Sequence, residues 1–176
     1  PDSQYVFVCS DIGDFKLIND IFGEEIGNEI LIGEARTFEQ IDYEGCIHGR
    51  ISGDKFAMLM RKEYFDENDI VRRFETFQTN LSKTFHYRIR IYLGVYEIEN
   101  PEEDILAMCD RGFVAISKND TEYTKILSYY DMSMVQELIT EKTILNDFTS
   151  ALERGEFIFY IQPQFNAKTQ CVNGGE

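Results

Sequence analysis

Short strand-like runs and longer helical segments succeed one another along most of this chain, and their order leaves few folds open. Residues 5–9 are an almost continuous apolar run, which predicts a strand buried on both faces. Residues 87–96 alternate apolar with polar side chains, as a strand between two different environments does. Two more strands are expected over 47–51 and 56–60. Between them lies Ser52-Gly53-Asp54-Lys55, a hairpin signal in which the glycine can adopt a positive φ.

Helices are predicted from apolar residues at helical spacing and from end signals. Asp66 favours an N-cap, and Asn100-Pro101 favours a helix start because proline suits the first helical position. A further strand is expected over 125–130. This order of elements predicts an α+β sheet domain that ends near residue 131. The expected helices cover residues 15–22, 23–41, 66–82 and a segment that begins at Asn100.

The remaining residues are predicted to form a connector that leads into something further. Ser133-x-x-Gln136 resembles a capping box that opens a helix to about Arg154, and Gly155 can end it. Residues 157–161 are strongly β-prone. An exposed edge of this kind is prone to aggregation. We therefore expect the segment to pair with another copy or to dock back on the sheet domain.

The net charge excludes some classes of partner. Lys and Arg number 17 against 32 Asp and Glu, a formal charge of −15. Nucleic acids and anionic membrane surfaces both require a basic patch, so neither is an expected partner. No apolar run approaches the roughly 18 residues that cross a bilayer. A cytoplasmic location is expected, although the parent protein could be tethered by something outside these residues.

Cysteine and histidine residues give no sign of a metal centre. The cysteines are scattered, none lies at CxxC spacing, and His48 and His86 have no partner at a catalytic spacing. We interpret the cysteines as small core residues in a reducing compartment.

Two acidic residues stand where strands are expected to end. Asp11 lies in a polar loop that follows the first strand, and Asp54 lies at the tip of the hairpin. If the strands are neighbours, these carboxylates and the Ile12 carbonyl form a hard-oxygen Mg²⁺ site, which phosphates would complete. The first loop would also aim backbone N–H groups at phosphate near Phe15 and Lys16. The alternative is that both aspartates are ordinary loop and turn residues.

Four motifs in order resemble the GGDEF domains, the diguanylate cyclase family. The stretch from Ser10 through Asp20 to Gly27-Asn28 resembles the opening D-I-D-x-F-K-x-I-N-D and G-x-x-x-G-D of that family. Residues 50–56, Arg-Ile-Ser-Gly-Asp-Lys-Phe, look like its R-x-G-G-D/E-E-F signature. Residues 93–95 and 115–118 look like two later motifs. The resemblance covers about residues 4–130.

This resemblance implies a fold, a reaction and a set of site residues. The family has a nucleotide-cyclase-like fold with a central, mostly antiparallel sheet flanked by helices. It joins two GTP molecules into cyclic di-GMP across a homodimer and uses Mg²⁺. Asp54 and Lys55 stand in the catalytic signature. The resemblance implies metal ligation by Asp11, the Ile12 carbonyl and Asp54, and nucleotide binding by Phe15, Lys16, Asn19, Asn28, Gly53 and Lys118.

The sequence departs from the family pattern at the positions that would carry chemistry. Lys55 replaces an acid beside the expected metal, which disfavours a second cation there. Ser52 replaces a glycine where backbone approaches phosphate. Asn28 replaces an aspartate that would accept hydrogen bonds from guanine, and a charged acceptor contributes roughly 1.5–3 kcal/mol. The other departures are Gly13 for a second aspartate, Thr121 or Glu122 for an arginine, and Tyr43 and Cys46 in the R-x-x-D product-inhibition motif.

Three hypotheses follow from these departures. The first is a degenerate GGDEF domain without cyclase activity, which binds GTP weakly or not at all and regulates an attached domain. The second is an active or weakly active diguanylate cyclase. The third is an interaction module that uses the helix over 133–153 as a dimerising connector.

The end of the chain resembles the start of a second family. Residues 151–164, from Ala-Leu-Glu-Arg-Gly to Gln-Pro-Gln, resemble the opening of EAL domains, the cyclic di-GMP phosphodiesterases. Glu176 would then be the glutamate of the E-x-L signature. The resemblance implies a tandem GGDEF–EAL parent, with a degenerate GGDEF domain over 1–131, a connector helix over 132–155 and a truncated EAL start over 156–176.

Overall fold

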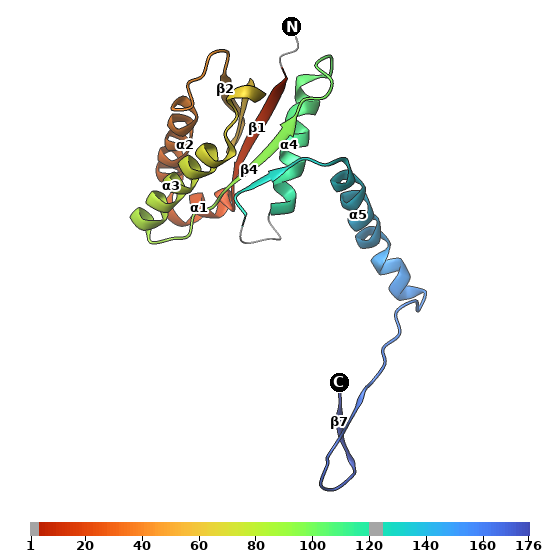
Figure 1. The fold of residues 1–176 in the computed structure, drawn as a ribbon. Helices are drawn as coiled ribbons and strands as arrows, with labels where there is room; N and C mark the ends of the chain where they lie inside the picture. Colours follow the sequence, from red (N-terminus) through yellow and green to blue (C-terminus); the bar gives the residue numbers. More distant parts are fainter. Residues whose placement is uncertain (1–3, 120–124) are drawn as a thin grey trace. The chain divides into compact units, whose positions relative to one another are not determined.

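The structure is a computed structural model, which describes residues 4–119 and 125–176 (Figure 1). The chain divides into two compact units, Pro1–Val135 and Gln136–Glu176, and each is described by itself. The elements of the first unit are β1 Tyr5–Ile12, α1 Phe15–Phe22, α2 Glu24–Glu39, β2 Ile47–Ser52, β3 Lys55–Arg61, the short 3-10 helix η1 Lys62–Tyr64, α3 Glu67–Phe85, β4 Ile91–Glu97, α4 Ile105–Asn119 and β5 Leu127–Tyr129. Helix α5, Met132–Glu153, leads into the second unit.

A five-stranded sheet organises the first unit, with strand order β2-β3-β1-β4-β5. All neighbouring strands are antiparallel except β4 and β5, which are parallel. Helices α2 and α3 lie over one face, and α4 lies over the other (Figure 1). The fold is thus the expected α+β class with a central, mostly antiparallel sheet flanked by helices.

Strand β1 lies at the centre of the sheet and is covered on both sides. Val6 and Val8 join the core beneath α2 and α3, whereas Phe7 and Cys9 join the core beneath α4. The apolar run over residues 6–9 has this cause, since each of its side chains enters one core or the other.

Helix α4 packs very closely on the sheet. A Cβ placed on Gly94 of β4 would stand 1.9 Å from the carbonyl oxygen of Gly112 in α4. Only two residues without side chains allow this approach of backbone to backbone.

Several predicted end signals are confirmed. The hairpin between β2 and β3 turns at Gly53, whose φ is 55°. The Asp66 side chain accepts hydrogen bonds from the N–H groups of Asn68 and Asp69 at the start of α3. Gly155 has a φ of 71° just after α5.

The expected polar loop after residue 9 is wrong at its beginning. Ser10, Asp11 and Ile12 continue β1, since the antiparallel register with β4 runs on to Ile12 opposite Ile91. Ser10 is fully buried, because its hydroxyl has a partner on α2.

Two expected helix starts are also wrong. Helix α4 begins at Ile105 and not at Pro101, with the Asp104 carboxylate accepting from the Leu106 N–H. The Asn100 side chain accepts from the Glu102 N–H and stabilises a turn. At α5, the N–H of Ser133 donates to Asp131, so the aspartate caps this helix where a serine was expected to.

The second unit departs most from the predictions. Residues 157–161 form no strand, and their side chains are exposed. The two-stranded sheet of this unit pairs β6, Pro163–Phe165, with β7, Val172–Gly175. Cys171 is exposed, unlike the buried Cys9 and Cys109, so its assignment to a core was wrong. Among the helices of the described residues, none has the length and apolar composition needed to cross a bilayer.

Candidate functional site

The expected acidic residues meet where β1 ends beside the hairpin. Ser10 pairs with Phe56 in the register of β1 and β3, so Asp11 emerges next to the turn that carries Asp54. Both aspartates are partly buried. The Arg50 Nε donates to the carbonyl oxygen of Gly53 at 2.6 Å, which braces the turn across the hairpin.

A third carboxyl group belongs to Glu34 on α2, which contacts the end of β1 through Ser10. Its side chain is fully buried, and the Ser10 hydroxyl donates to Oε1 at 2.6 Å. Its Oε2 has no hydrogen-bond partner among the described residues. Burial raises the pKa of Glu34 to about 8; the Ser10 hydrogen bond opposes this rise, and the charges of Asp54 and Asp11 add to it. Both aspartates therefore act on one buried carboxyl group.

The sequence analysis missed Glu34, although the chain carries a signal for it. It follows Leu31 by three residues and precedes Phe38 by four, so it lies on the apolar face of α2. A glutamate on such a face is unusual and marks a site that needs explanation.

Lys55 follows Asp54 in the hairpin, and its side chain reaches α4. Its Nζ is 4.7 Å from the centroid of the Phe113 ring on α4, a cation–π contact. The charge that replaces the family's acid is thus held against the helix by an aromatic face.

Gly13 leaves space that a neighbouring tyrosine fills. A Cβ on Gly13 would stand 2.8 Å from Cε2 of Tyr92, whose ring is buried. The Tyr92 hydroxyl accepts from Nη1 of Arg90 at 3.3 Å, which holds the ring in place. An acid at position 13 has no room unless this ring moves.

The expected nucleotide-binding residues of α1 lie at the contact with α2. The Oδ1 of Asn19 is buried without a hydrogen-bond partner among the described residues, and it lies against Gly27 so closely that a Cβ there would stand 1.8 Å away. Phe15 also lines this contact, whereas Lys16 is exposed.

Asn28 follows Gly27 on α2. It is exposed and lines an open groove of about 530 Å³ between α2 and β2, together with Leu31, His48, Arg50 and Phe56. The structure therefore brings Asp11 and Asp54 together and leaves Asn28 over a largely apolar groove.

Some expected residues receive no structural test. Lys118 falls at the end of α4, where its side chain is outside the described part, and Thr121 and Glu122 are outside the described residues. Tyr43 is exposed and stacks on Tyr64 at 5.5 Å between ring centroids. Cys46 is partly buried.

The carboxylates at this edge of the sheet fit a metal ion only in part. Across residues 4–119 and 125–176, no three His, Cys, Asp or Glu side chains are grouped to hold one. Asp11 and Asp54 supply hard oxygen donors that suit Mg²⁺. An ion here would need a backbone carbonyl and ligand phosphates in addition to these two carboxylates.

Comparison with known proteins identifies the family. The model of the family "Diguanylate cyclase, GGDEF domain" matches residues 1–112. The signaling protein YkoW of Bacillus subtilis is 22% identical over 94% of this chain and 21% of its own length. The biofilm architecture maintenance protein MbaA of Vibrio cholerae is 25% identical over 99% of this chain and 24% of its own length. A diguanylate cyclase of Vibrio cholerae is 29% identical over 63% of this chain and 35% of its own length.

Solved structures share the fold. The active GGEEF domain of a diguanylate cyclase from Vibrio cholerae superposes with a TM-score of 0.58 at 22% identity, covering 74% of this chain and 85% of that one. An EAL/GGDEF domain protein from M. capsulatus gives 0.59 at 19% identity, covering 74% and 86%. The chain spans between about a fifth and a third of the length of the three curated relatives described above. By its family match and its fold, this chain belongs to the GGDEF domain family.

Proposed function

We propose that this chain is the GGDEF module of a cyclic di-GMP signalling protein and that it binds Mg²⁺–GTP without converting it to product. The observation that carries the proposal is the register of β1 and β3, which places Asp11 beside the turn that carries Asp54. Two carboxylates at this edge suit a hard cation bound to phosphates. When bound, Mg²⁺ would neutralise phosphate charge and stabilise the entering and leaving oxygens of a phosphoryl transfer.

This chain's own residues support binding better than turnover. The unpaired Oδ1 of Asn19 offers guanine an acceptor at the α1–α2 contact. Lys55 follows Asp54 in the sequence and carries a positive charge where the family has an acid, which disfavours a second metal ion. Asn28, which replaces the family's aspartate, offers guanine an uncharged acceptor. We infer that the ground-state complex forms and that the reaction does not proceed.

Calorimetric titration tests this proposal. GTP is added to the chain with Mg²⁺ and with a chelator, and ATP serves as the control nucleotide. We expect heat of binding only with GTP and Mg²⁺, and we expect Asp54→Ala to abolish it. Chromatography of the same mixtures should detect no cyclic di-GMP. The absence of binding at millimolar GTP would contradict the proposal and leave an interaction role.

The alternative function is an active or weakly active diguanylate cyclase that works as a homodimer. Its support is that Asp11 and Asp54, the expected metal ligands, are both present and adjacent. Cyclic di-GMP production that disappears in Asp54→Ala would establish this alternative. A gain of product only after Ser52→Gly, Asn28→Asp and Lys55→Glu are combined would support loss of turnover instead.

We further propose that residues 156–176 begin an EAL domain and that the GGDEF domain over 1–131 regulates it through a connector over 132–155. The exposed apolar side chains of residues 157–161 support this, because they would be buried as a strand of a larger domain. Phosphodiesterase assays of the longer parent protein test the proposal. Adding GTP should change the rate, and Asp54→Ala should abolish that change.

A further inference from the structure

Lys55 is a charged residue of the hairpin whose ammonium group has no carboxylate partner in the part of the chain that the structure describes. The side chain is half-buried. Its Nζ lies against the face of the Phe113 ring on α4, 4.7 Å from the ring centroid. Partial burial of an ammonium group costs free energy that a nearby anion would offset. Lys55 is therefore suited to an anion that comes from outside the chain.

The strand register places Lys55 on the same face of the sheet as Asp11. Strands β1 and β3 pair antiparallel as far as Ser10 opposite Phe56. Continued by one residue, this register sets Asp11 opposite Lys55, and both residues lie within their strands. Directly opposite residues of antiparallel strands have side chains on one face, with Cβ atoms about 4.5–5.5 Å apart. The stem of Lys55 therefore starts beside the proposed metal ligand.

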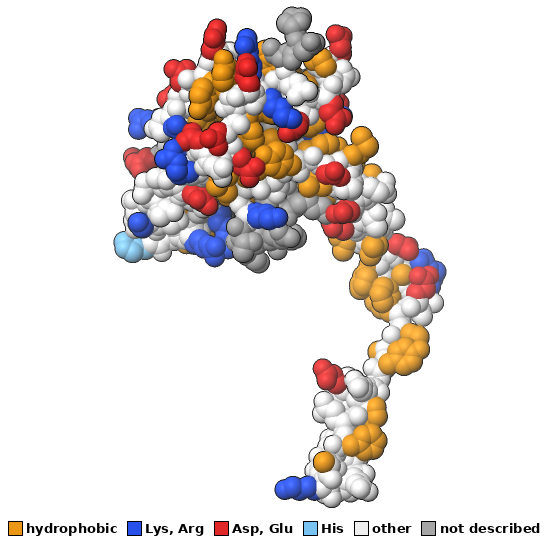
Figure 2. Space-filling model, in the orientation of Figure 1, with side chains coloured by type: hydrophobic (Ala, Val, Ile, Leu, Met, Phe, Trp, Pro, Cys, Tyr) orange, Lys and Arg blue, Asp and Glu red, His pale blue; other side chains and the backbone are white. Residues whose placement is uncertain are grey.

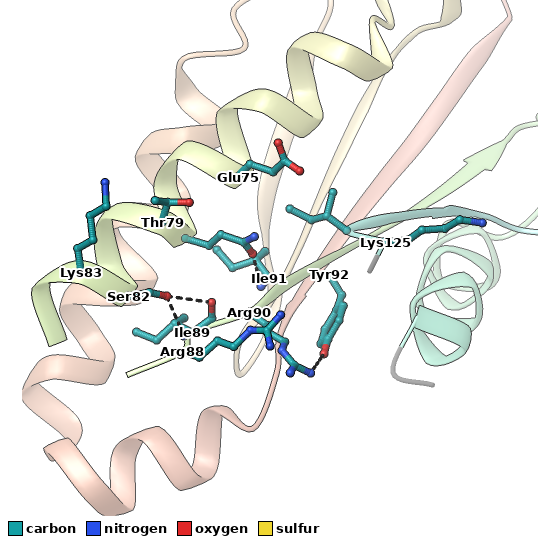
Figure 3. Close-up of a pocket in the computed structure, with 12 residues that line it drawn as sticks. Glu75, Thr79, Ser82, Lys83, Arg88, Ile89, Arg90, Ile91, Tyr92 and Lys125 are labelled. Atoms are coloured by element: carbon teal, nitrogen blue, oxygen red, sulfur yellow. Dashed lines mark hydrogen bonds between the residues drawn. The ribbon is translucent and has the colours of Figure 1, made fainter. Parts of the chain in front are cut away.

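The pairing of Asp11 with β4 identifies this face as the one that α4 covers. Asp11 is opposite Tyr92, whose ring belongs to the core beneath α4. Figure 3 shows this ring beside Arg90, from which its hydroxyl accepts a hydrogen bond. Glu34, in contrast, contacts β1 from α2, on the other face. The sheet therefore lies between Lys55 and the buried carboxyl group of Glu34, and the two cannot pair.

We propose that Lys55 contacts the phosphates of the bound nucleotide and that Phe113 is the residue that positions its ammonium group. The inference rests on the proposed binding of Mg²⁺–GTP and names a further residue that holds this ligand. A triphosphate at neutral pH carries more negative charge than one Mg²⁺ neutralises, so another cation stabilises the complex. Lysine is a compact point charge that binds phosphate well, and here it supplies the charge in place of a second metal ion.

The Phe113 ring holds the ammonium group without neutralising it. Phe113 is itself partly buried against the core beneath α4, so its position is fixed by packing. A contact between a cation and an aromatic face is weaker than a charge-assisted hydrogen bond to phosphate, so a ligand can engage the ammonium group. The flexible lysine stem is meanwhile kept near the site, which lowers the entropic cost of binding.

Calorimetric titration of GTP with Mg²⁺ into the full chain tests the inference. Lys55→Met keeps an unbranched stem and removes the charge, and it should weaken GTP binding about tenfold, as loss of one charge-assisted hydrogen bond does. Added salt should reduce the difference between the two proteins, because ions screen the contact. Lys and Arg side chains lie at several other places on the first unit (Figure 2), which provides a matched control. Lys83→Met removes an exposed lysine of α3 and should leave the affinity nearly unchanged.

Substitutions of Phe113 test its positioning role. Phe113→Leu removes the aromatic face and should weaken GTP binding, whereas Phe113→Tyr keeps a ring and should retain it. In the Lys55→Met background, Phe113→Leu should have no further effect, since both changes act on one contact. NMR of the ligand-free chain supplies a readout that a purely structural role would not move. The Lys55 Cε protons should be shifted upfield by the ring and should return to ordinary shifts in Phe113→Leu.

The outcomes separate this inference from the proposal on which it rests. If the wild-type chain binds Mg²⁺–GTP and Lys55→Met binds it equally or more tightly, the inference is overturned and the proposed function stands. If the wild-type chain does not bind GTP at millimolar concentration, the proposed function fails and the inference falls with it. Additive effects of the two substitutions, or unshifted Lys55 protons in the wild-type chain, would overturn the role of Phe113. Thermal unfolding establishes that each variant is folded.

Discussion

The two compact units of this chain differ in how far their large apolar side chains are exposed to solvent. In the first, Phe38 and Phe74 are fully buried and pack edge to face at 5.0 Å between ring centroids. In the second, Phe159 is 87% exposed and Tyr160 is 85% exposed. Apolar surface of this extent usually marks an interaction site. The first unit therefore contains its own core, whereas the second presents side chains that a further part of the protein would cover.

The largest expected effect is a loss of stability caused by a substitution in the core of the first unit. Phe74→Ala would leave a cavity in the core beneath α2 and α3, so we expect a loss of about 3–5 kcal/mol in the free energy of unfolding. Urea denaturation followed by circular dichroism measures it. A loss below about 1 kcal/mol would show that this core collapses around the missing ring.

A pH titration tests the polar part of the same core. Because the folded-state pKa of Glu34 is raised to about 8 from an ordinary value of 4.5, the folded chain keeps a proton that the unfolded chain loses. The stabilisation linked to the proton on Glu34 is fully present below pH 4.5. The free energy of unfolding then decreases by about 1.4 kcal/mol per pH unit as the pH rises to about 8.

The variant Glu34→Gln should flatten this dependence when unfolding is followed in a chelator. Glu39→Gln is the matched control, since that residue is exposed on the same helix. An identical pH profile for the wild-type chain and Glu34→Gln would contradict the assignment.

A smaller effect is expected at the start of α3. Asp66→Ala removes the acceptor for the N–H groups of Asn68 and Asp69, which should cost about 1 kcal/mol. Asp66→Asn keeps an acceptor and should restore most of that loss. Thermal unfolding of the three proteins makes the comparison, and equal midpoints would mean that water replaces the cap.

The smallest effect on stability is expected in the second unit. Phe159→Ser should change the free energy of unfolding by less than about 0.5 kcal/mol, because the ring is exposed. It should nevertheless reduce self-association in light scattering if residues 157–161 pair with another copy. Unchanged self-association would favour burial within the parent protein over pairing between copies.

The sequence predicted the strands and turns of the sheet domain more accurately than the helix starts and the segment that follows α5. Gly53 and Asp66 carry local signals, a positive φ and a side-chain cap, and both were located correctly. Pro101 carries a similar signal, yet α4 begins at Ile105 because Asp104 supplies a cap closer to the packed face. Residues 157–161 have strand-forming side chains and no partner strand within the second unit, so β-propensity alone did not decide their conformation.

The candidate site was predictable only in its outline. β1 and β3 are neighbours, so Asp11 lies beside the turn that carries Asp54, because strand register is set by long apolar patterns. Glu34 was missed because its role depends on Ser10, which lies 24 residues earlier in the sequence.

The Tyr92 ring, which fills the space beside Gly13, limits which side chains can be introduced at position 13. An acid at position 13 and the Tyr92 ring in its present position exclude one another. Reversal by the single change Gly13→Asp now meets the ring, which Arg90 holds. Restoring the second aspartate of the family motif therefore requires a compatible change at Tyr92 as well.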